Sequence, residues 1–157
     1  MAFGQNEKNV GDFNKVTSFD RIDVFLILGD ENKVQLDGKG ADEVEFVNKN
    51  GELKVRMGLE RRFRGANTKV KIFYNNIDKI YVHEGVFIFS KDTIAQTDIY
   101  VKADEGARVA FILNTATLST NTSSGAIMDL QGKTQHHRAK VNTGGELKAS
   151  RLETDET

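Results

Sequence analysis

Hydrophobic and polar residues alternate along most of the chain, and from residue 76 onward the alternation recurs about every 20 residues. An alternating stretch precedes a glycine and a second stretch follows it. These glycines are Gly85, Gly106, Gly125 and Gly145, which are spaced by 21, 19 and 20 positions. A strand–turn–strand unit that repeats at a short period is typical of a solenoid, in which each coil stacks on its neighbours. The pattern therefore predicts β-solenoid coils over 76–157.

The apolar residues of the repeating stretches are the expected interior of these coils. The candidates are Ile80, Val82, Phe87, Phe89, Ile99, Val101, Val109, Phe111, Ala126, Met128 and Leu130. Beyond Gly132 the chain is mostly charged and polar. A bare last coil is an open sheet edge. We therefore expect either that the acidic tail 153–157 blocks this edge or that the natural protein continues beyond Thr157.

The preceding residues, 13–75, predict β-strands that cap the solenoid. Residues 19–28 are apolar on both faces, which indicates a strand covered on both sides. Two hairpins are expected, one where Gly29 to Asn32 leads into 33–36 and one at Asn50-Gly51, since both of these last residues tolerate positive φ. Residues 1–12 are polar and non-periodic and are expected to form a flexible lead-in. No segment has a helical pattern, so we predict one all-β domain over 13–157.

Composition narrows the classes of function. Lys and Arg number 22 against 23 Asp and Glu, for a net charge of −1, and this balance argues against a nucleic-acid-binding protein. No apolar run is long enough to span a membrane, and no signal peptide is visible at the start. The absence of Cys excludes disulfides, thiolate metal sites and Cys nucleophiles. With 14 Gly and no Pro, the chain suits a fold of paired strands.

Several segments resemble the putative auto-transporter adhesin, head GIN domain family. They are residues 19–24, the following 34–36, the segment 50–55 and the Ser/Thr-rich 118–125. The resemblance covers 16–152 and rests on patterns of hydrophobicity and turns. It implies an exported bacterial protein, periplasmic or at the cell surface, with a right-handed, single-stranded β-helical body, no established activity and no catalytic residues. Family members usually begin with a signal sequence and usually continue with further Ser-Gly-Ala-Gly coils.

Acidic residues recur next to the turn glycines. Glu84 and Glu105 occupy equivalent positions in adjacent repeats, as do His83 and Asp104. Neighbouring coils would place each pair about 5 Å apart. Carboxylates at that distance repel each other unless they are solvated or share a cation. The sequence thus leaves two interpretations, a solvated acidic corner without a cofactor or a calcium site that includes Glu84, Asp104 and Glu105.

Two other segments are candidate ligand contacts. Arg61, Arg62 and Arg64 could hold a carboxylate, sulfate or phosphate through guanidinium forks, or could form an ordinary solvated turn. Asn121 and Ser123 belong to a Ser/Thr/Asn-rich segment that could form a hydrogen-bonding face for a glycan or protein, or could satisfy its own turns.

The sequence favours a non-enzymatic binding module of adhesin type, because no nucleophile–base motif or phosphate-binding loop is present. The first alternative is a polysaccharide-active enzyme that uses Glu84 and Glu105 with Lys102 or Arg108. The second is a scaffold that self-associates through its open last coil, near Leu152. Expected partners are a surface glycan or a protein, with neither nucleic acid nor a transmembrane segment.

Overall fold

The computed structural model describes residues 6–38, 40–58 and 68–156. The all-β prediction is confirmed, since the described residues form thirteen strands of one sheet and a single short 3-10 turn. The strands are β1 (Glu7–Asn9), β2 (Lys15–Ser18), β3 (Asp23–Leu28), β4 (Lys33–Gly38), β5 (Val44–Lys49), β6 (Glu52–Met57), β7 (Thr68–Tyr74), β8 (Lys79–Val82), β9 (Phe87–Ser90), β10 (Ile94–Ala103), β11 (Arg108–Thr122), β12 (Ile127–Val141) and β13 (Glu146–Glu156), and the 3-10 turn η1 covers Ala41–Glu43.

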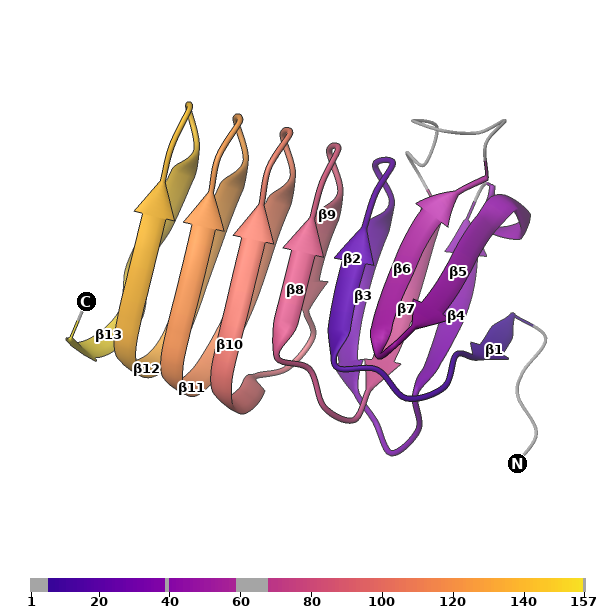
Figure 1. Cartoon of the computed structure of the whole chain (residues 1–157), viewed down its shortest axis with the longest axis horizontal. Coiled ribbons are helices and arrows are strands. Elements are labelled where there is room, and N and C mark those ends of the chain that lie inside the picture. The colour runs from indigo at the N-terminus through magenta and orange to yellow at the C-terminus, as the bar shows by residue number, and fades with distance from the viewer. Residues whose placement is uncertain (1–5, 39, 59–67, 157) are drawn as a thin grey trace.

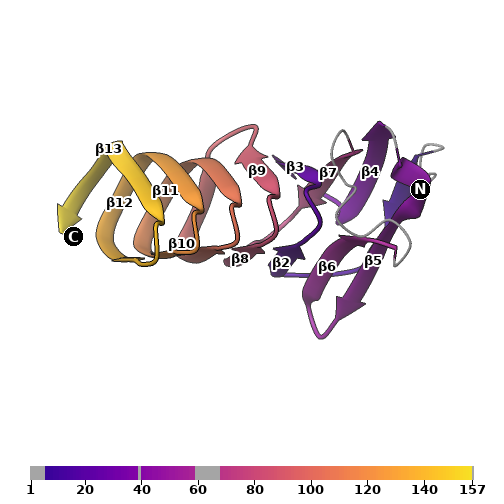
Figure 2. The ribbon, with the colours of Figure 1, turned by 90° about the horizontal axis from the view of Figure 1, so that it is seen from above.

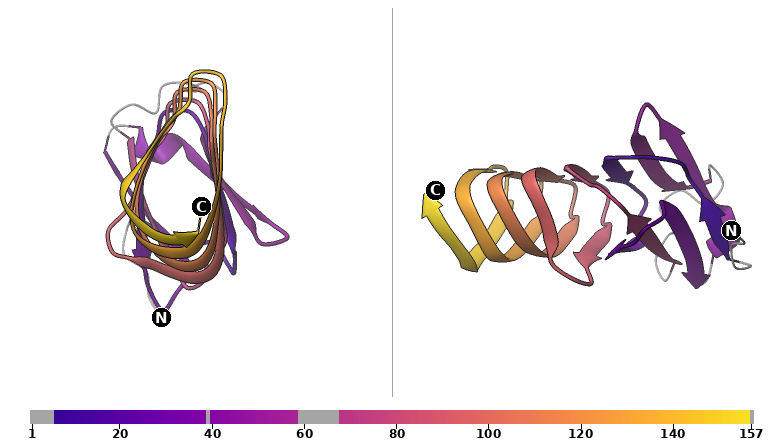
Figure 3. Two further views of the ribbon diagram at one scale, coloured as in Figure 1. Left: turned by 90° about the vertical axis from the view of Figure 1, so that its left-hand side faces the viewer. Right: turned by 90° about the horizontal axis from the view of Figure 1, so that it is seen from below.

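The sheet curls around one core, so that two rows of strands face each other (Figure 3). In the first row β6, β2, β8, β10 and the second halves of β11 and β12 pair in parallel. The opposite row contains β7, β3, β9 and the first halves of β11 and β12, followed by β13, and these strands also pair in parallel. Antiparallel pairs occur only at the N-terminal end of the described sheet, where β4 pairs with β1 and β7, and β5 pairs with β6. Figure 2 shows, from above, this N-terminal end and the C-terminal end where only parallel pairs occur.

At the N-terminal end, the order of the strands in the sheet differs from their order in the sequence. The β2–β3 unit lies between the β6–β7 unit and the β8–β9 unit. The predicted hairpin that follows Gly29 is therefore wrong, because β7 inserts between β3 and β4 and pairs with both. The hairpin at Asn50-Gly51 is confirmed: β5 and β6 pair on either side of it, and both turn residues have positive φ, 53° and 82°.

The turns of successive units are stacked and joined by backbone hydrogen bonds. Gly85 N–H donates to Glu105 O, Gly106 N–H to Ser124 O and Gly125 N–H to Thr143 O, at 3.0, 3.0 and 3.2 Å. The fourth turn glycine is Gly144, with φ 74°, rather than the predicted Gly145. Gly145 instead stands where the preceding unit has Ala126, one position after the left-handed pair.

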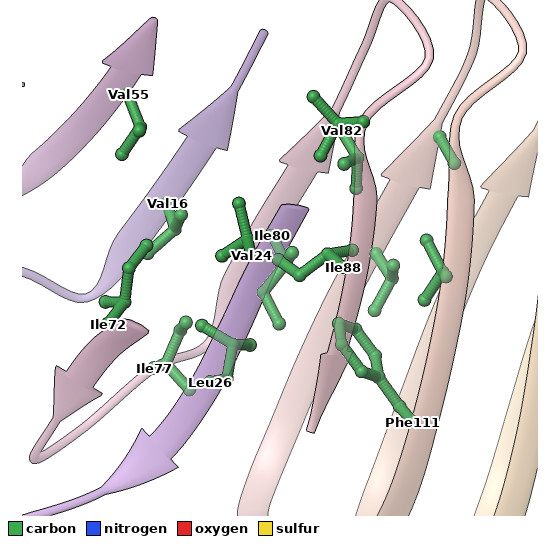
Figure 4. Close-up of a cluster of buried hydrophobic side chains, with 14 of the residues drawn as sticks. Val16, Val24, Leu26, Val55, Ile72, Ile77, Ile80, Val82, Ile88 and Phe111 are labelled. Carbon is green, nitrogen blue, oxygen red and sulfur yellow. The ribbon is translucent and has the colours of Figure 1, made fainter. Parts of the chain in front are cut away.

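The core runs along the inside of both rows and is formed mainly by aliphatic side chains, with Phe111 among them (Figure 4). Val24, Ile80 and Ile88 are fully buried there. Most of the predicted interior residues are buried, but Phe87 and Phe89 are exceptions. Phe87 is 37% exposed and Phe89 is half-buried, because Val86 and Ile88 supply the inward-facing positions of that segment.

Candidate binding surfaces

The first row of strands runs from β6 to β12 (Figure 1). The register of these strands aligns two columns of residues on their outer side, and each strand contributes one residue to each column. From β6 to β12 the first column is Glu52, Lys15, Lys79, Tyr100, Ser119 and Arg138. The second column is Lys54, Thr17, Tyr81, Lys102, Asn121 and Lys140. We call this surface the basic face, because six of its twelve positions are Lys or Arg and only one is acidic.

Strand periodicity places these residues outward. Successive side chains of a strand point to opposite sides, and the residues that alternate with the two columns, such as Val16 and Ile80, are fully buried. Among the basic residues, Lys54, Lys79, Arg138 and Lys140 are exposed. The alternation of the sequence therefore builds a surface of concentrated positive charge on a chain whose net charge is −1.

Tyrosine rings lie among these cations. Lys15 Nζ is 3.9 Å from the centroid of the Tyr81 ring, and Lys102 Nζ is 5.9 Å from the same centroid. The Tyr81 and Tyr100 rings are 5.7 Å apart and tilted by 56°. The resulting cation–π contacts hold the lysines close to the sheet.

The single acid of the basic face is already paired. Lys15 Nζ lies 3.2 Å from Glu52 Oε2, and Thr17 Oγ1 donates a hydrogen bond to the same oxygen at 2.8 Å. This hydrogen bond, together with the charges of Lys15 and Lys54, lowers the pKa of Glu52. The carboxylate is thus ionised at neutral pH, while the other five cations have no ion pair within the described part of the chain.

The stacked turns bring together the predicted acidic residues. Asp20, Glu84 and Glu105 occupy equivalent turn positions, all at positive φ, and Arg21 N–H donates to Glu84 O at 3.0 Å. Burial, a hydrogen bond with Asp20 and the charges of Asp20 and Glu105 raise the pKa of Glu84 to about 7. Asp20 was not predicted from the sequence, because it lies 64 positions before Glu84 and is followed by Arg21 where the later turns have glycine.

The neighbouring position of each turn forms a second set. His83 Nδ1 is 2.5 Å from Asp104 Oδ1, and the Phe19 ring stacks on His83 with a centroid distance of 5.1 Å. Ligand atoms of His83, Asp104 and Glu105 all lie within 4.8 Å of one another. Three protein donors fall short of the roughly six to eight oxygens that calcium takes. Calcium at this corner, with Glu84, Asp104 and Glu105 as ligands, stays a prediction.

Two of the remaining predicted contacts lie at the end of β11. Asn121 lies in the second column of the basic face, and Ser123 lies in the turn that follows β11, with its N–H donating to Ala103 O at 3.0 Å. Arg61, Arg62 and Arg64 lie outside the described residues.

The outer side of the opposite row carries aromatic rings on β3 and β9. The Phe25 and Phe89 rings are 4.2 Å apart and perpendicular, and Phe87 and Phe89 are 5.4 Å apart. This explains why 19–28 is apolar on both sides: its inward residues enter the core, while the outward Phe25 packs against the neighbouring strand.

In the described part of the chain, no helix is long and apolar enough to cross a membrane.

Several solved structures have a similar fold. A putative adhesin from Bacteroides fragilis aligns with a TM-score of 0.77 at 14% identity, covering 94% of this chain and 71% of that one. A putative adhesin from Parabacteroides merdae aligns with a TM-score of 0.68 at 15% identity, covering 96% and 73%. A putative lipid binding protein from Parabacteroides distasonis aligns with a TM-score of 0.64 at 13% identity, covering 94% and 74%. At these identities the likeness concerns the fold.

Comparison with curated proteins found no significant match. A family model does match, over residues 12–157, and its description is putative auto-transporter adhesin, head GIN domain. The match covers nearly the whole chain, in agreement with the resemblance noted in segments 19–24 and 50–55. The chain therefore belongs to the putative auto-transporter adhesin, head GIN domain family.

Proposed function

We propose that the chain is a non-enzymatic binding module of an exported protein, periplasmic or at the cell surface, and that its strands form the coils of a β-solenoid. The observation that carries this proposal is the basic face, where residues from six strands form one outward surface. Parallel pairing fixes the spacing of these residues, so the surface is ordered before a ligand arrives and loses little conformational entropy on binding. Family membership and adhesin neighbours support the same class of function.

The acidic corner supports binding better than hydrolysis. A glycosidase needs two carboxyl groups on either side of a substrate bond. Glu84 and Glu105 instead belong to stacked turns that hydrogen-bond to each other, and Glu84 shares its surroundings with Asp20. His83 is engaged with Asp104 on one side and with the Phe19 ring on the other.

The test is a binding screen of the purified chain on an array of glycans and matrix proteins, with and without calcium. Each bound glycan is also analysed for chain shortening. Reproducible binding without cleavage is the expected result, and calcium dependence would add the Glu84–Glu105 corner to the site. Cleavage of a glycan would overturn the proposal in favour of an enzyme.

One observation favours a second candidate, assembly through the C-terminal end of the sheet. Among the described strands β13 pairs with β12, and it is the last strand at the C-terminal end of the sheet. Such an edge can pair with another chain. This scaffold would be supported over the binding module by two results together. The first is the absence of binding on the array, and the second is a particle size that grows with protein concentration and decreases in the variant Leu152→Lys.

A further inference from the structure

We propose that the basic face binds an acidic polysaccharide, which lies across the strands along the two columns. This inference rests on the proposed function and names the ligand class of the same surface. Its basis is the local charge. Among the described residues, five cations of this face have no ion pair, on a chain that is slightly acidic as a whole; they are Lys54, Lys79, Lys102, Arg138 and Lys140.

The direction of the ligand follows from the arrangement of the cations. Lys54 is on β6, Lys79 on β8 and Lys102 on β10, so the positive charges succeed one another from strand to strand rather than along one strand. Neighbouring strands lie about 4.8 Å apart, and six strands therefore span about 24 Å. An extended polymer with a charge on many of its units can meet these cations in series, whereas a small anion would engage only one or two.

The side chains between the cations suit sugar units. Tyr100 presents a half-buried ring, whose face can pack against the C–H groups of a pyranose while the phenol hydroxyl meets water. The neighbouring Tyr81 ring holds Lys15 in place for the acidic groups of the polymer. Ser119 and Asn121 supply hydroxyl and amide groups for sugar hydroxyls, and both lie on β11, which adds no cation to the two columns. Asn121, a candidate ligand contact from its sequence context, thereby acquires a defined place in the site.

The same surface is poorly suited to nucleic acid. Nucleic-acid-binding domains carry a strong basic excess overall, and this chain has a net charge of −1. The turns that border the basic face carry the carboxyl groups of Glu84, Asp104 and Glu105. Phosphates that extend past the columns toward these turns would meet like charge.

The test uses a decamer of galacturonic acid as the probe and its fully methyl-esterified form as the uncharged control, with fluorescence anisotropy at several salt concentrations. The variant Lys79→Gln/Lys102→Gln removes two adjacent cations from the centre of the face. The control variant Lys91→Gln/Lys133→Gln removes the same charge from exposed positions outside the two columns. Both double variants change the net charge equally, so the comparison isolates the place of the charge.

We expect the charged decamer to bind and the esterified decamer to bind at least tenfold more weakly. Lys79→Gln/Lys102→Gln is expected to weaken binding by about 10- to 100-fold and to reduce the slope of log affinity against log salt by about two, since two fewer counterions are released. Lys91→Gln/Lys133→Gln is expected to stay within twofold of the parent chain. A circular-dichroism melt of each variant establishes that it is folded.

Three outcomes would overturn the inference. Equal losses in both double variants would mean that charge acts without a site. Tighter binding of a thymidine oligonucleotide than of the decamer would make the face a nucleic-acid interface. Binding of only neutral glycans or proteins on the array, unaffected by Lys79→Gln/Lys102→Gln, would reject the polysaccharide site while leaving the binding module intact.

Discussion

The two ends of the molecule share their strand geometry and differ in what fills them. One inward column of the first row reads Leu53, Val16, Ile80, Val101, Thr120 and Ala139 from the N-terminal to the C-terminal end. The first four members are fully buried and aliphatic, whereas Thr120 hydrogen-bonds to His137 and Ala139 is exposed. Parallel backbone pairing thus continues along the whole column, while the contribution of hydrophobic burial to the free energy of unfolding declines. In the opposite row the C-terminal half keeps buried apolar side chains such as Met128 and Leu130. We infer that the first row loses hydrophobic stabilisation toward its C-terminal end, where the ladder and polar contacts contribute a larger share.

The polar contacts of the C-terminal units are themselves buried. Thr115 Oγ1 donates to Thr134 Oγ1 at 2.7 Å, and Thr120 Oγ1 lies 3.0 Å from His137 Nε2. Each hydrogen bond contributes about 0.5–1.5 kcal/mol, less than a well-packed aliphatic side chain contributes. The difference between the two ends is therefore a difference in magnitude, which substitutions can measure.

The largest expected effect concerns Gly132 of β12, where the backbone of the neighbouring strand comes very close. Gly132 has φ 110°, and a Cβ at this position would lie 2.0 Å from the carbonyl oxygen of Leu113. Because that neighbour is backbone, Gly132→Ala is expected to lower the free energy of unfolding by at least about 4 kcal/mol. Chemical denaturation with urea measures the change.

The matched control is Gly106→Ala in a stacked turn. Gly106 has φ 76°, and a Cβ there would meet nothing within 4 Å. Its only expected cost is that of a left-handed alanine, about 1 kcal/mol. Similar losses for the two variants would contradict the close approach at Gly132 and would point to loose packing at this end.

The second prediction compares the same substitution at two places in one column. Val82 and Val141 both belong to the inward column that also contains Ala103 and Thr122, but Val82 is fully buried and Val141 is 45% exposed. Val82→Ala is expected to cost about 2–3 kcal/mol, from lost burial and the cavity left behind. Val141→Ala is expected to cost less than about 0.5 kcal/mol. Equal costs in urea denaturation would refute the gradient of stability.

The sequence predicted local features better than distant ones. The hairpin at Asn50-Gly51 depends on two adjacent residues that accept positive φ, and the structure has it. The expected hairpin after Gly29 failed because β7, from much later in the chain, takes the place beside β3. Which strand becomes a neighbour depends on long-range packing, and no local pattern encodes it.

The inward and outward sides of a strand were predicted only where polar residues mark the outside. In 86–89 all four residues are apolar, so alternation could not decide between Phe87 and Ile88, and the interior took the smaller aliphatic side chains. The acidic corner was predicted only in part, because the signal was the spacing of the turn glycines. This spacing located Glu84 and Glu105, whereas Asp20 belongs to a turn that has no glycine.

The third prediction concerns a titrating group near the stable end. The pKa of Glu84 is raised to about 7 in the folded chain, from an ordinary value of 4.5, chiefly by burial and by Asp20. A folded state that holds this proton more tightly is stabilised at low pH, and the contribution is lost as pH rises from about 4.5 through 7. Glu84→Gln keeps a hydrogen-bond donor for Asp20 without the charge. Because solvent screens the charges around this partly exposed group, the expected gain in the free energy of unfolding is only about 1 kcal/mol at pH 8, and it is close to zero at pH 4.5.

Thermal melts of the parent chain and Glu84→Gln across this range test the prediction. Glu105→Gln is the control in the next turn, where the carboxyl group is exposed. It is expected to give a smaller gain at pH 8, because it removes only one of the charges that act on Glu84. A stabilisation by Glu84→Gln that is the same at every pH would contradict the raised pKa of Glu84.

The smallest expected effect has the opposite pH dependence and belongs to the C-terminal units. His137 is 5% exposed, and burial lowers its pKa below the ordinary value of 6.5, so the folded chain holds it neutral beside Thr120. The unfolded chain gains a proton as pH falls below about 6.5, and the folded chain resists it, so stability is lost toward acid. Between pH 7 and pH 5 the free energy of unfolding of the parent chain is expected to fall by about 1 kcal/mol more than that of His137→Gln, and amide exchange should show the loss first in β12 and β13.

The control is the neighbouring His136, which is exposed and lies 3.3 Å from Glu156, so His136→Gln should keep the acid sensitivity of the parent. If acid instead opened β2 and β8 first, the weaker end of the molecule would be the aliphatic one, and the comparison between the two ends would be reversed.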